Sequence, residues 1–411
     1  MSADDGAALI VGAGQAGLQA AESLRAGGWS GPVVLLGDED EGPYHRPPLS
    51  KAWLAREVEA AQLTMRARAA LERKGIELRN GTAVRAIRRE RHAVELADGS
   101  ELRYRGLVLA TGATARRIAL PGAQARGVVV LRTLADARHL AAALEGCATS
   151  GQPLVIIGGG FIGLEVAATA RKLGVEVAVV EAAPRLLAGA LPPQLSEWYA
   201  GLHAAHGVRV SCGVAPVAIE TADGAVSGVA LADGSVLPAG LVLVGVGAAP
   251  NDALAREAGL ECAPGIVVDA QARTADPAIY AAGDCAVRRV DGGVLRLQSV
   301  FNAVEQGKLA AAGLLGQSPT APGVPWFWSD QFDARLQVAG LGGGADAVVL
   351  RGDPAGGAFS AFLYRGDALA AVVSINAPQD HMAARKLLAA GRSPAPQRVA
   401  DATLPLAAMM T

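Results

Sequence analysis

Two glycine-rich runs of the form Gly-X-Gly-X-X-Gly, beginning at Gly12 and Gly158, constrain the fold of this chain more than any other feature. Each run follows a short apolar segment typical of a buried strand, and each opens a segment with helical periodicity. In this setting the first glycine permits a tight turn, the second lets the backbone approach a pyrophosphate, and the third lets the helix pack on the strand. The sequence therefore predicts two dinucleotide-binding βαβ units.

The first unit is predicted as a strand at residues 7–11, a helix at 14–26 and a strand at 33–36. Its glycines are Gly12, Gly14 and Gly17. A helix N-terminus attracts phosphate, and an acidic residue that closes the second strand accepts hydrogen bonds from ribose hydroxyls. Asp38 and Glu39 stand at that position, so one of them is predicted to bind an adenosine ribose.

The second unit repeats this plan with a strand at 154–157, a helix at 161–173, a strand at 175–180 and then Glu181. The predicted nucleotide-binding residues are Gly158, Gly160, Phe161, Ile162, Gly163 and Glu181. Arg185 follows closely and could favour a 2′-phosphate, whereas Glu181 would repel one. We expect preference for NADH over NADPH.

Both halves also end alike. Asp98-Gly99 precedes an apolar strand at 107–112, and Asp233-Gly234 precedes another at 241–247. Each Asp-Gly pair is a hairpin signal. Two nucleotide domains of one plan indicate a flavoprotein that takes hydride from a nicotinamide, because one cofactor must pass electrons to the other.

Length and composition set further limits. A chain of 411 residues exceeds what one core usually supports, and its net charge of −2 provides no general field for nucleic acid or an anionic membrane. The acidic start, Met1 to Asp5, predicts neither a signal nor a transit peptide, and no apolar run is long enough to span a membrane. Four widely spaced cysteines suggest buried thiols in a reducing cytoplasm.

The predicted fold class is α/β, with two Rossmann-like domains and a C-terminal α+β domain. Residues 1–113 and 244–324 are predicted to bind FAD, residues 114–243 to bind NAD, and residues 325–411 to form the third domain. Pro319, Pro322 and Pro325 mark the last boundary. Beyond it we expect strands at 336–341, 358–364 and 369–375, and a helix at 380–390.

Five segments together resemble the FAD-dependent, NADH-oxidising ferredoxin reductases of bacterial oxygenase systems, most closely the reductase component of biphenyl-type aromatic dioxygenases and also the putidaredoxin reductase family. They are Pro43 to Lys51, Ala110 to Gly112, Gly160 to Glu165, Tyr280 to Asp284 and Pro325 to Gln331. The resemblance implies electron transfer from NADH through FAD to a 2Fe-2S ferredoxin, expected to be of the Rieske type that serves a ring-hydroxylating dioxygenase. A P450-linked ferredoxin or a small acceptor such as a quinone or oxygen is the alternative. The resemblance does not decide between a monomer and a homodimer.

The resemblance also implies residue roles. Arg46 would face the FAD pyrophosphate, Asp284 would bind the ribityl chain, and Arg132 would lie near FAD. Lys51 and Glu165 would sit beside the reactive edge of the flavin, where a lysine can stabilise negative charge, and Trp328 would lie near the isoalloxazine. The remaining residues predicted to bind FAD are Ala83, Thr111, Gly112, Gly283 and Val300, and Gly247 is predicted to bind NAD.

Histidine and cysteine positions bear on the chemistry as well. His203 and His206 share a helix face, but no third ligand has sensible spacing, so we expect solvated histidines and no metal. Disulfide reductases and cysteine-based NADH oxidases of this fold need a cysteine near Arg46 to Lys51, and none is present. Electrons are therefore expected to leave singly to an outside carrier. The basic residues that could bind this carrier are Arg66, Arg68, Arg288, Arg289 and Arg296.

Overall fold

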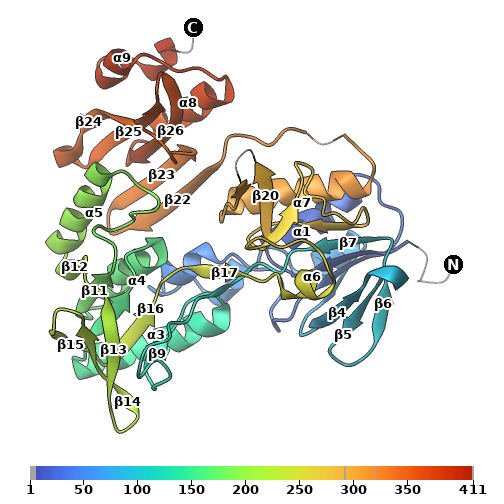
Figure 1. Cartoon of the computed structure of the whole chain (residues 1–411), viewed down its shortest axis with the longest axis horizontal. Coiled ribbons are helices and arrows are strands. Elements are labelled where there is room, and N and C mark those ends of the chain that lie inside the picture. Colours follow the sequence, from blue (N-terminus) through green and yellow to red (C-terminus); the bar gives the residue numbers. More distant parts are fainter. Residues whose placement is uncertain (1–5, 291–292, 319, 410–411) are drawn as a thin grey trace. The chain divides into compact units, whose positions relative to one another are not determined.

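The computed structural model describes residues 6–290, 293–318 and 320–409 (Figure 1). Met1 to Asp5 and Pro319, which entered the sequence predictions, lie outside these residues. The chain folds into two compact units. Unit 1 contains Met1–His45, Ala60–Thr114 and Ala248–Gly323, and unit 2 contains Arg46–Glu59, Ala115–Gly247 and Val324–Thr411. The division into three functional domains stays a prediction.

Unit 1 is built on a parallel five-stranded sheet in the order β19-β7-β1-β2-β3. Its strands are β1 (Ala8–Val11), β2 (Val33–Leu36), β3 (Ile76–Arg79), β7 (Gly106–Leu109) and β19 (Ile279–Ala281). The side chains of β1 alternate between two apolar clusters, with Ile10 facing α1 (Gln15–Ala26) and α7 (Val300–Leu314), and Leu9 facing the other side. Burial on both faces explains why this strand reads as a continuous apolar run.

Two small sheets complete unit 1. The antiparallel sheet contains β4 (Val84–Arg88), β5 (Ala93–Leu96) and β6 (Glu101–Arg103), and the mixed sheet contains β18 (Ile266–Val268), β20 (Ala286–Val290) and β21 (Gly293–Leu295). The other elements are α2 (Arg68–Arg73), α6 (Ala253–Glu257), β8 (Ala113–Ala115), β17 (Ala248–Pro250), η2 (Ala60–Leu63) and η3 (Arg89–Arg91). Asp98-Gly99 connects β5 to β6, as predicted.

Unit 2 repeats the same plan. Its parallel sheet has the order β12-β11-β10-β16-β9, with β9 (Val128–Val129), β10 (Leu154–Ile157), β11 (Val177–Glu181), β12 (Val208–Cys212) and β16 (Leu241–Val244). Strand β10 pairs with β11 and β16, just as β1 pairs with β2 and β7. The helices are α3 (Leu134–Ser150), α4 (Phe161–Lys172) and α5 (Pro193–Ala205), with η1 (Pro47–Ser50). An antiparallel sheet of β13 (Pro216–Ala222), β14 (Ala225–Leu231) and β15 (Val236–Pro238) contains the Asp233-Gly234 hairpin.

The end of unit 2 is an antiparallel sheet in the order β22-β23-β26-β25-β24. Its strands are β22 (Trp326–Gln331), β23 (Ala334–Gly340), β24 (Ala347–Asp353), β25 (Ala358–Arg365) and β26 (Ala368–Ile375). One face packs on α8 (Pro378–Ala389) and α9 (Pro396–Ala400), as Figure 1 shows, and the other joins the cluster that contains α4 and α5. The short helices are η4 (Pro354–Gly356) and η5 (Leu406–Met409).

The predicted elements differ from the structure mainly in extent. Strand β11 begins at Val177 rather than 175 and includes Glu181, and helix α4 ends at Lys172. Strand β23 begins at Ala334, two residues before its predicted start, and α8 begins at Pro378. Strands β22 and β24 of the C-terminal sheet were not predicted.

Candidate functional site

The three glycines of the first fingerprint occupy positions that fit a pyrophosphate site. Gly12 has φ +111°, and a Cβ there would lie 2.1 Å from the Ala110 carbonyl oxygen. A Cβ at Gly17 would lie 1.9 Å from the Gly12 carbonyl oxygen. A Cβ at Gly14 would meet nothing within 4 Å. Gly12 and Gly17 are therefore fixed by the turn and the packing, while the open space beside Gly14 is available to a ligand.

The second fingerprint has the same arrangement. Gly158 has φ +112°, a Cβ there would lie 2.5 Å from the Gly245 carbonyl oxygen, and a Cβ at Gly160 would meet nothing within 4 Å. A Cβ at Gly163 would lie 2.5 Å from the Gly158 carbonyl oxygen. Both fingerprints thus keep their middle glycine open.

The helices after the fingerprints begin without a side-chain cap. Gly14 and Gly160 are the N-cap residues of α1 and α4, and neither first turn contains an acidic residue. By contrast, Thr133 and Asp136 form a reciprocal capping box on α3. Uncapped N–H groups at a helix N-terminus favour an anion. The two helix starts therefore fit the phosphates of a dinucleotide.

Glu181 lies at the end of β11 and contacts the second fingerprint. One carboxylate oxygen accepts a hydrogen bond from the Gly159 N–H at 2.6 Å, and the other accepts from the Ala183 N–H at 2.7 Å. The guanidinium of Arg185 donates to the Leu191 carbonyl at 2.6 Å and to Ser196 Oγ at 2.7 Å. Arg185 is therefore held by protein groups, and the acidic residue lies at the fingerprint.

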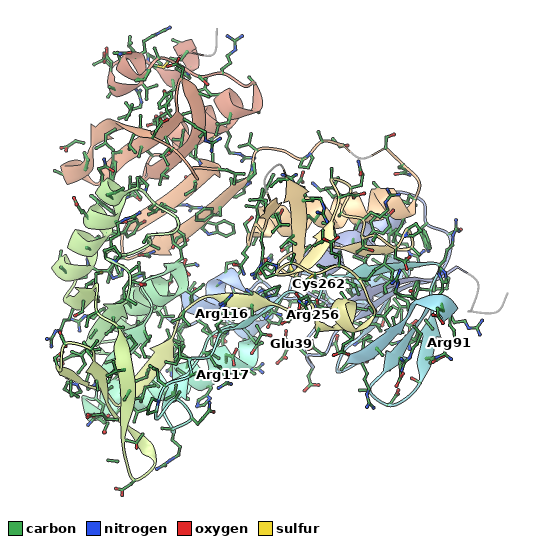
Figure 2. All side chains as sticks on the ribbon, in the orientation of Figure 1. Glu39, Arg91, Arg116, Arg117, Arg256 and Cys262 are labelled. Atoms are coloured by element: carbon green, nitrogen blue, oxygen red, sulfur yellow. The ribbon has the colours of Figure 1, made fainter. Side chains whose placement is uncertain are left out.

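The acidic residues of unit 1 differ in their surroundings. Asp38 is exposed, whereas Glu39 (labelled in Figure 2) is half-buried and accepts a hydrogen bond from Tyr44 Oη at 2.5 Å. The Thr82 N–H donates to the Gly37 carbonyl at 2.7 Å. Ala83, the next residue, is therefore close to the end of β2, where both acids stand.

Other predicted FAD residues of unit 1 follow the carboxyl ends of its parallel strands. Thr111 and Gly112 follow β7, and Thr111 Oγ1 donates to the Asn251 carbonyl at 2.6 Å. Gly283 and Asp284 follow β19, and the Gly283 N–H donates to Gln306 Oε1 at 2.8 Å. Ligands of open α/β sheets bind at this edge. Val300 begins α7, whose N-cap is Ser299.

In unit 2 the structure brings together the two residues that the resemblance assigns to the reactive edge of the flavin. Lys51 Nζ lies 2.7 Å from Glu165 Oε2. The Glu165 side chain is only 3 % exposed and also accepts hydrogen bonds from Ser50 Oγ at 2.5 Å and from Ser329 Oγ at 2.6 Å. Hydrogen bonds and an opposite charge offset the cost of burying a carboxylate. This carboxylate is therefore held from three sides.

Ser50 and Ser329 were not predicted as members of this cluster. Both lie inside segments that carry the family resemblance, 43–51 and 325–331. Ser50 also holds α4 through its carbonyl oxygen, which accepts a hydrogen bond from Thr169 Oγ1 at 2.9 Å. Their positions within those segments were the one sequence feature that could have identified them as site residues.

Arg46 and Arg132, the two arginines predicted near FAD, also meet in unit 2. Arg46 Nη1 donates to the Arg132 carbonyl at 2.9 Å, and the Arg132 N–H donates to Asp136 Oδ2 at 3.0 Å. Arg46, at the start of η1, is therefore hydrogen-bonded to the segment that leads into α3.

Strand β22 places its aromatic side chains on two faces. The Phe327 ring packs edge-on against Phe161 of α4, with centroids 5.2 Å apart. Trp326 and Trp328 lie on the opposite face of the strand, with ring centroids 5.6 Å apart. Both indoles are half-buried. Of the other predicted NAD residues, Ile162 is 45 % exposed, and the Gly247 carbonyl accepts the Arg116 N–H at 2.9 Å.

The prediction that both helix histidines are solvated is wrong for His203. Its side chain is fully buried, and Nε2 lies 2.9 Å from Gln331 Oε1. Burial lowers the pKa of His203 below its usual value. His206 is exposed and stacks on Phe332, with centroids 3.9 Å apart. Within the described ranges, no group of three His, Cys, Asp or Glu side chains could hold a metal ion.

The four cysteines are free thiols, of which Cys147 and Cys285 are buried and Cys212 and Cys262 half-buried. Burial raises the pKa of each thiol, so the reactive thiolate is disfavoured. As for membranes, none of the helices formed by the described residues combines the length and the apolar character needed to cross one.

Four of the five arginines proposed for docking have partners within unit 1. Arg66 pairs with Glu22 at 2.9 Å and Arg289 with Glu261 at 2.6 Å. The guanidinium groups of Arg68 and Arg296 donate to the carbonyl oxygens of Leu78 and Asp284. These contacts restrict the side chains without removing their charge.

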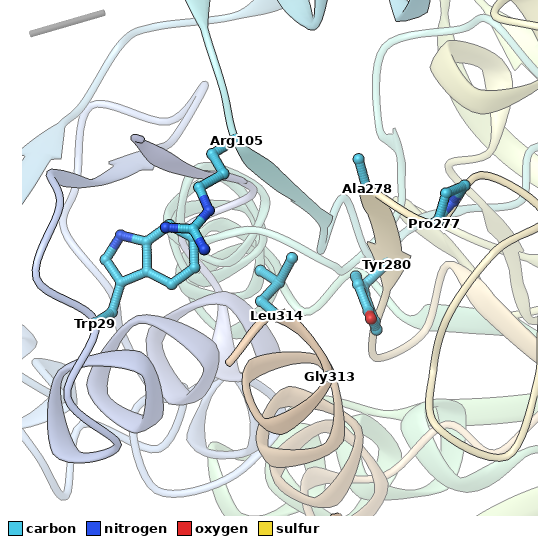
Figure 3. Close-up of a pocket in the computed structure, with 7 residues that line it drawn as sticks. All are labelled: Trp29, Arg105, Pro277, Ala278, Tyr280, Gly313 and Leu314. Atoms are coloured by element: carbon cyan, nitrogen blue, oxygen red, sulfur yellow. The ribbon is translucent and has the colours of Figure 1, made fainter. Parts of the chain in front are cut away.

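A pocket of about 250 Å³ in unit 1 lies away from the predicted nucleotide site (Figure 3). Arg105 comes directly before β7, and Pro277 and Ala278 come directly before β19. The pocket therefore lies at the amino ends of strands whose carboxyl ends carry the predicted FAD residues. Its Arg105 guanidinium stacks over the Trp29 ring at 5.1 Å.

Known protein families and individual proteins match nearly the whole length of this chain. A family model described as pyridine nucleotide-disulphide oxidoreductase matches residues 7–307, and one described as reductase C-terminal matches residues 326–410. Rhodocoxin reductase of Rhodococcus erythropolis is 45 % identical over 96 % of this chain and 92 % of its own length. The ferredoxin–NAD(+) reductase component of the anthranilate 1,2-dioxygenase system of Burkholderia cepacia is 43 % identical over 99 % of each chain.

Among solved structures, the ferredoxin reductase for the CYP199A2 system from Rhodopseudomonas palustris superposes with a TM-score of 0.95. It is 41 % identical, and the match covers 99 % of this chain and 100 % of that one. The predicted fold class and the family resemblance are confirmed.

Proposed function

This chain belongs to the pyridine nucleotide-disulphide oxidoreductase family, and we propose that it is an NADH-dependent ferredoxin reductase whose acceptor is a 2Fe-2S ferredoxin of the Rieske type. The observation that carries the two-cofactor chemistry is the pair of fingerprints, each with its middle glycine open and its helix uncapped. The named relatives that span nearly the whole chain support the ferredoxin as acceptor.

FAD and NAD(H) are the cofactors of this family. When bound, FAD accepts two electrons as a hydride and releases them one at a time, which suits an acceptor that takes one electron. We assign residues 1–113 and 244–324 to FAD binding, residues 114–243 to NAD binding, and residues 325–411 to the C-terminal domain. Gly12, Gly14 and Gly17 serve FAD, and the fingerprint at Gly158 serves NADH.

The chain's own groups supply charge and orientation. We assign Lys51 and Glu165 to hydride transfer: the ammonium stabilises developing negative charge, and the carboxylate fixes the ammonium. Arg46 and Asp284 are assigned to the pyrophosphate and the ribityl chain, because a guanidinium forks onto phosphate and a carboxylate accepts from hydroxyls. Trp328 is assigned to the isoalloxazine.

The relatives named above include the reductase of an anthranilate dioxygenase system and the reductase of a CYP199A2 system. We place this enzyme with the dioxygenases, and the anthranilate dioxygenase component, which matches over 99 % of each chain, supports this choice. Since NADH is its donor, we place it in the cytoplasm. Turnover with each purified ferredoxin as sole acceptor tests the assignment. A higher kcat/KM for the Rieske type supports it, and a higher value for the P450 type would replace it.

The bound flavin is expected to be FAD, at one per chain, and FMN should not replace it. Asp38 and Glu39 stand where they would bind an adenosine ribose, which FMN lacks. Denaturing the purified protein and separating the released flavin by chromatography identifies it. Recovery of FMN would contradict the assignment of the first fingerprint.

NADH should exceed NADPH in kcat/KM by about 100-fold, because placing a 2′-phosphate against Glu181 costs several kcal/mol. Arg185 cannot offset this without breaking its bonds to Leu191 and Ser196. Steady-state kinetics with both nucleotides measures the ratio. Glu181→Gln should narrow it, and comparable efficiencies in the parent enzyme would show that Glu181 does not select the nucleotide.

A further inference from the structure

Glu165 is the end of a buried series of hydrogen-bonded polar side chains in unit 2. Ser329 Oγ lies 2.6 Å from Glu165 Oε1, Gln331 Nε2 lies 3.1 Å from Ser329 Oγ, and His203 Nε2 lies 2.9 Å from Gln331 Oε1. Ser329 and Gln331 are each 1 % exposed, and His203 is fully buried. These hydrogen bonds therefore link α4 through the end of β22 to α5, and every side chain that takes part is buried.

The periodicity of β22 explains how this series arises. Phe327, Ser329 and Gln331 occupy alternate positions, so their side chains lie on one face of the strand. On α4, Phe161 and Glu165 are four residues apart and share a helix face. Phe161 packs on Phe327, and Glu165 one turn later meets Ser329. Strand and helix are thus in register along this contact.

All three hydrogen bonds point toward the carboxylate. The Glu165 carboxylate is an acceptor, so the Ser329 hydroxyl donates to it, and Ser329 Oγ then accepts from the Gln331 amide. Gln331 Oε1 carries no proton, so His203 Nε2–H donates to it. The lowered pKa of His203 favours the neutral ring, which can donate from only one nitrogen. Each bond polarises the next in the same direction.

We propose that Ser329, Gln331 and His203 are positioning residues that fix Glu165 Oε1, so that Oε2 stays on Lys51 Nζ during hydride transfer. A carboxylate held through only one oxygen could rotate about its terminal torsion and move the lysine with it. The inference rests on the proposed role of Lys51 and Glu165. It adds three residues to which no catalytic role was assigned above.

If these polar side chains served only stability, we would expect all of their buried polar atoms to be hydrogen-bonded. The Nδ1 atom of His203 is buried with no hydrogen-bond partner among the described residues, and the neighbouring Tyr199 hydroxyl on α5 is also without one. Burying polar groups with unmet capacity opposes stability. At His203 the ring nitrogen that is hydrogen-bonded, Nε2, is the one on the path to Glu165, and Nδ1 is not.

The test compares Ser329→Ala with Ser360→Ala. Ser360 is a matched control, because it is a fully buried serine of the same C-terminal sheet that bonds to Ser374 and Asp380 instead. We expect Ser329→Ala to lower the limiting rate of flavin reduction at saturating NADH about tenfold, the effect of losing one hydrogen bond to a charged group, with the Kd of NADH unchanged. Ser329→Thr, which keeps the hydroxyl, should recover most of the rate. Ser360→Ala should match the parent enzyme.

A second variant, Gln331→Glu, tests the direction in which these hydrogen bonds donate, and it leaves the size of the side chain almost unchanged. A carboxylate at this position would accept from both His203 and Ser329, which turns the serine hydroxyl away from Glu165. The limiting rate should therefore fall as in Ser329→Ala. In a Glu165→Ala background, Ser329→Ala should have no further effect, because coupled residues are not additive.

Failure of this inference is distinguishable from failure of the proposed function. If Lys51→Met slows flavin reduction but Ser329→Ala and Gln331→Glu do not, the positioning role is wrong and the role of the pair stands. If Ser329→Ala and Ser360→Ala slow it equally, the effect is general destabilisation and the inference is overturned. If Lys51→Met has no effect, the proposed function of the pair fails first.

Discussion

Lys51→Met should lower the limiting rate of flavin reduction by NADH about 100-fold, the usual consequence of removing a charged group that stabilises developing charge. FAD should stay bound, because the fingerprint that begins at Gly12 is unchanged. Glu165→Ala should have a similar effect, since it removes the carboxylate that pairs with the ammonium. Stopped-flow bleaching of the flavin absorbance measures both rates.

Lys172→Met is the matched control for these variants. Lys172 ends α4, the helix that carries Glu165, but its side chain is half-exposed and its nearest carboxylate, Glu57, is 3.9 Å away. Exposed ion pairs contribute little, so this variant should reduce at the parental rate. Unchanged reduction in Lys51→Met and Glu165→Ala would remove both residues from the reaction.

Gly14→Ala and Gly160→Ala should separate the two cofactor sites. A Cβ at either position meets no protein atom within 4 Å, so both variants should fold. The methyl group instead fills space that a pyrophosphate needs, and we expect affinity for that dinucleotide to fall about 100-fold. Gly14→Ala should lose FAD during purification. Gly160→Ala should keep FAD and require far more NADH for half-maximal reduction.

Gly146→Ala serves as the control for both glycine variants. Gly146 lies within α3, away from either fingerprint, and a Cβ there also meets nothing within 4 Å. Flavin content, NADH dependence and melting temperature, measured together, separate site effects from folding effects. Retention of FAD by Gly14→Ala, or unchanged NADH dependence in Gly160→Ala, would contradict the assigned fingerprint.

The sequence predicted the nucleotide units well because their signals are local. Buried parallel strands read as apolar runs, and each fingerprint lies within one strand-turn-helix segment, so β1 with α1 and β10 with α4 follow from neighbouring residues. Both Asp-Gly hairpins are local in the same sense. The predicted starts of β11 and β23 differ from the structure by two residues, because strand ends depend on pairing with distant strands.

The buried cluster was harder to predict. Glu165 meets Ser329, which is 164 residues away, and His203 meets Gln331, which is 128 residues away. Histidine spacing on α5 is compatible with a solvated or a buried ring, and only the position of β22 decides between them. The family resemblance identified Lys51 and Glu165, whereas the side chains that hold them could be identified only from the folded structure.

The central claim is that electrons from NADH leave this enzyme one at a time to a ferredoxin. The most direct measurement reduces the enzyme anaerobically with NADH and mixes it in a stopped-flow instrument with a Rieske-type ferredoxin, a P450-linked ferredoxin, a quinone or oxygen. We expect flavin reoxidation to be fastest with a ferredoxin, and to slow as ionic strength rises, because local charge steers the encounter although the net charge is only −2. Reoxidation by oxygen or the quinone as fast as by any ferredoxin tried would contradict the account.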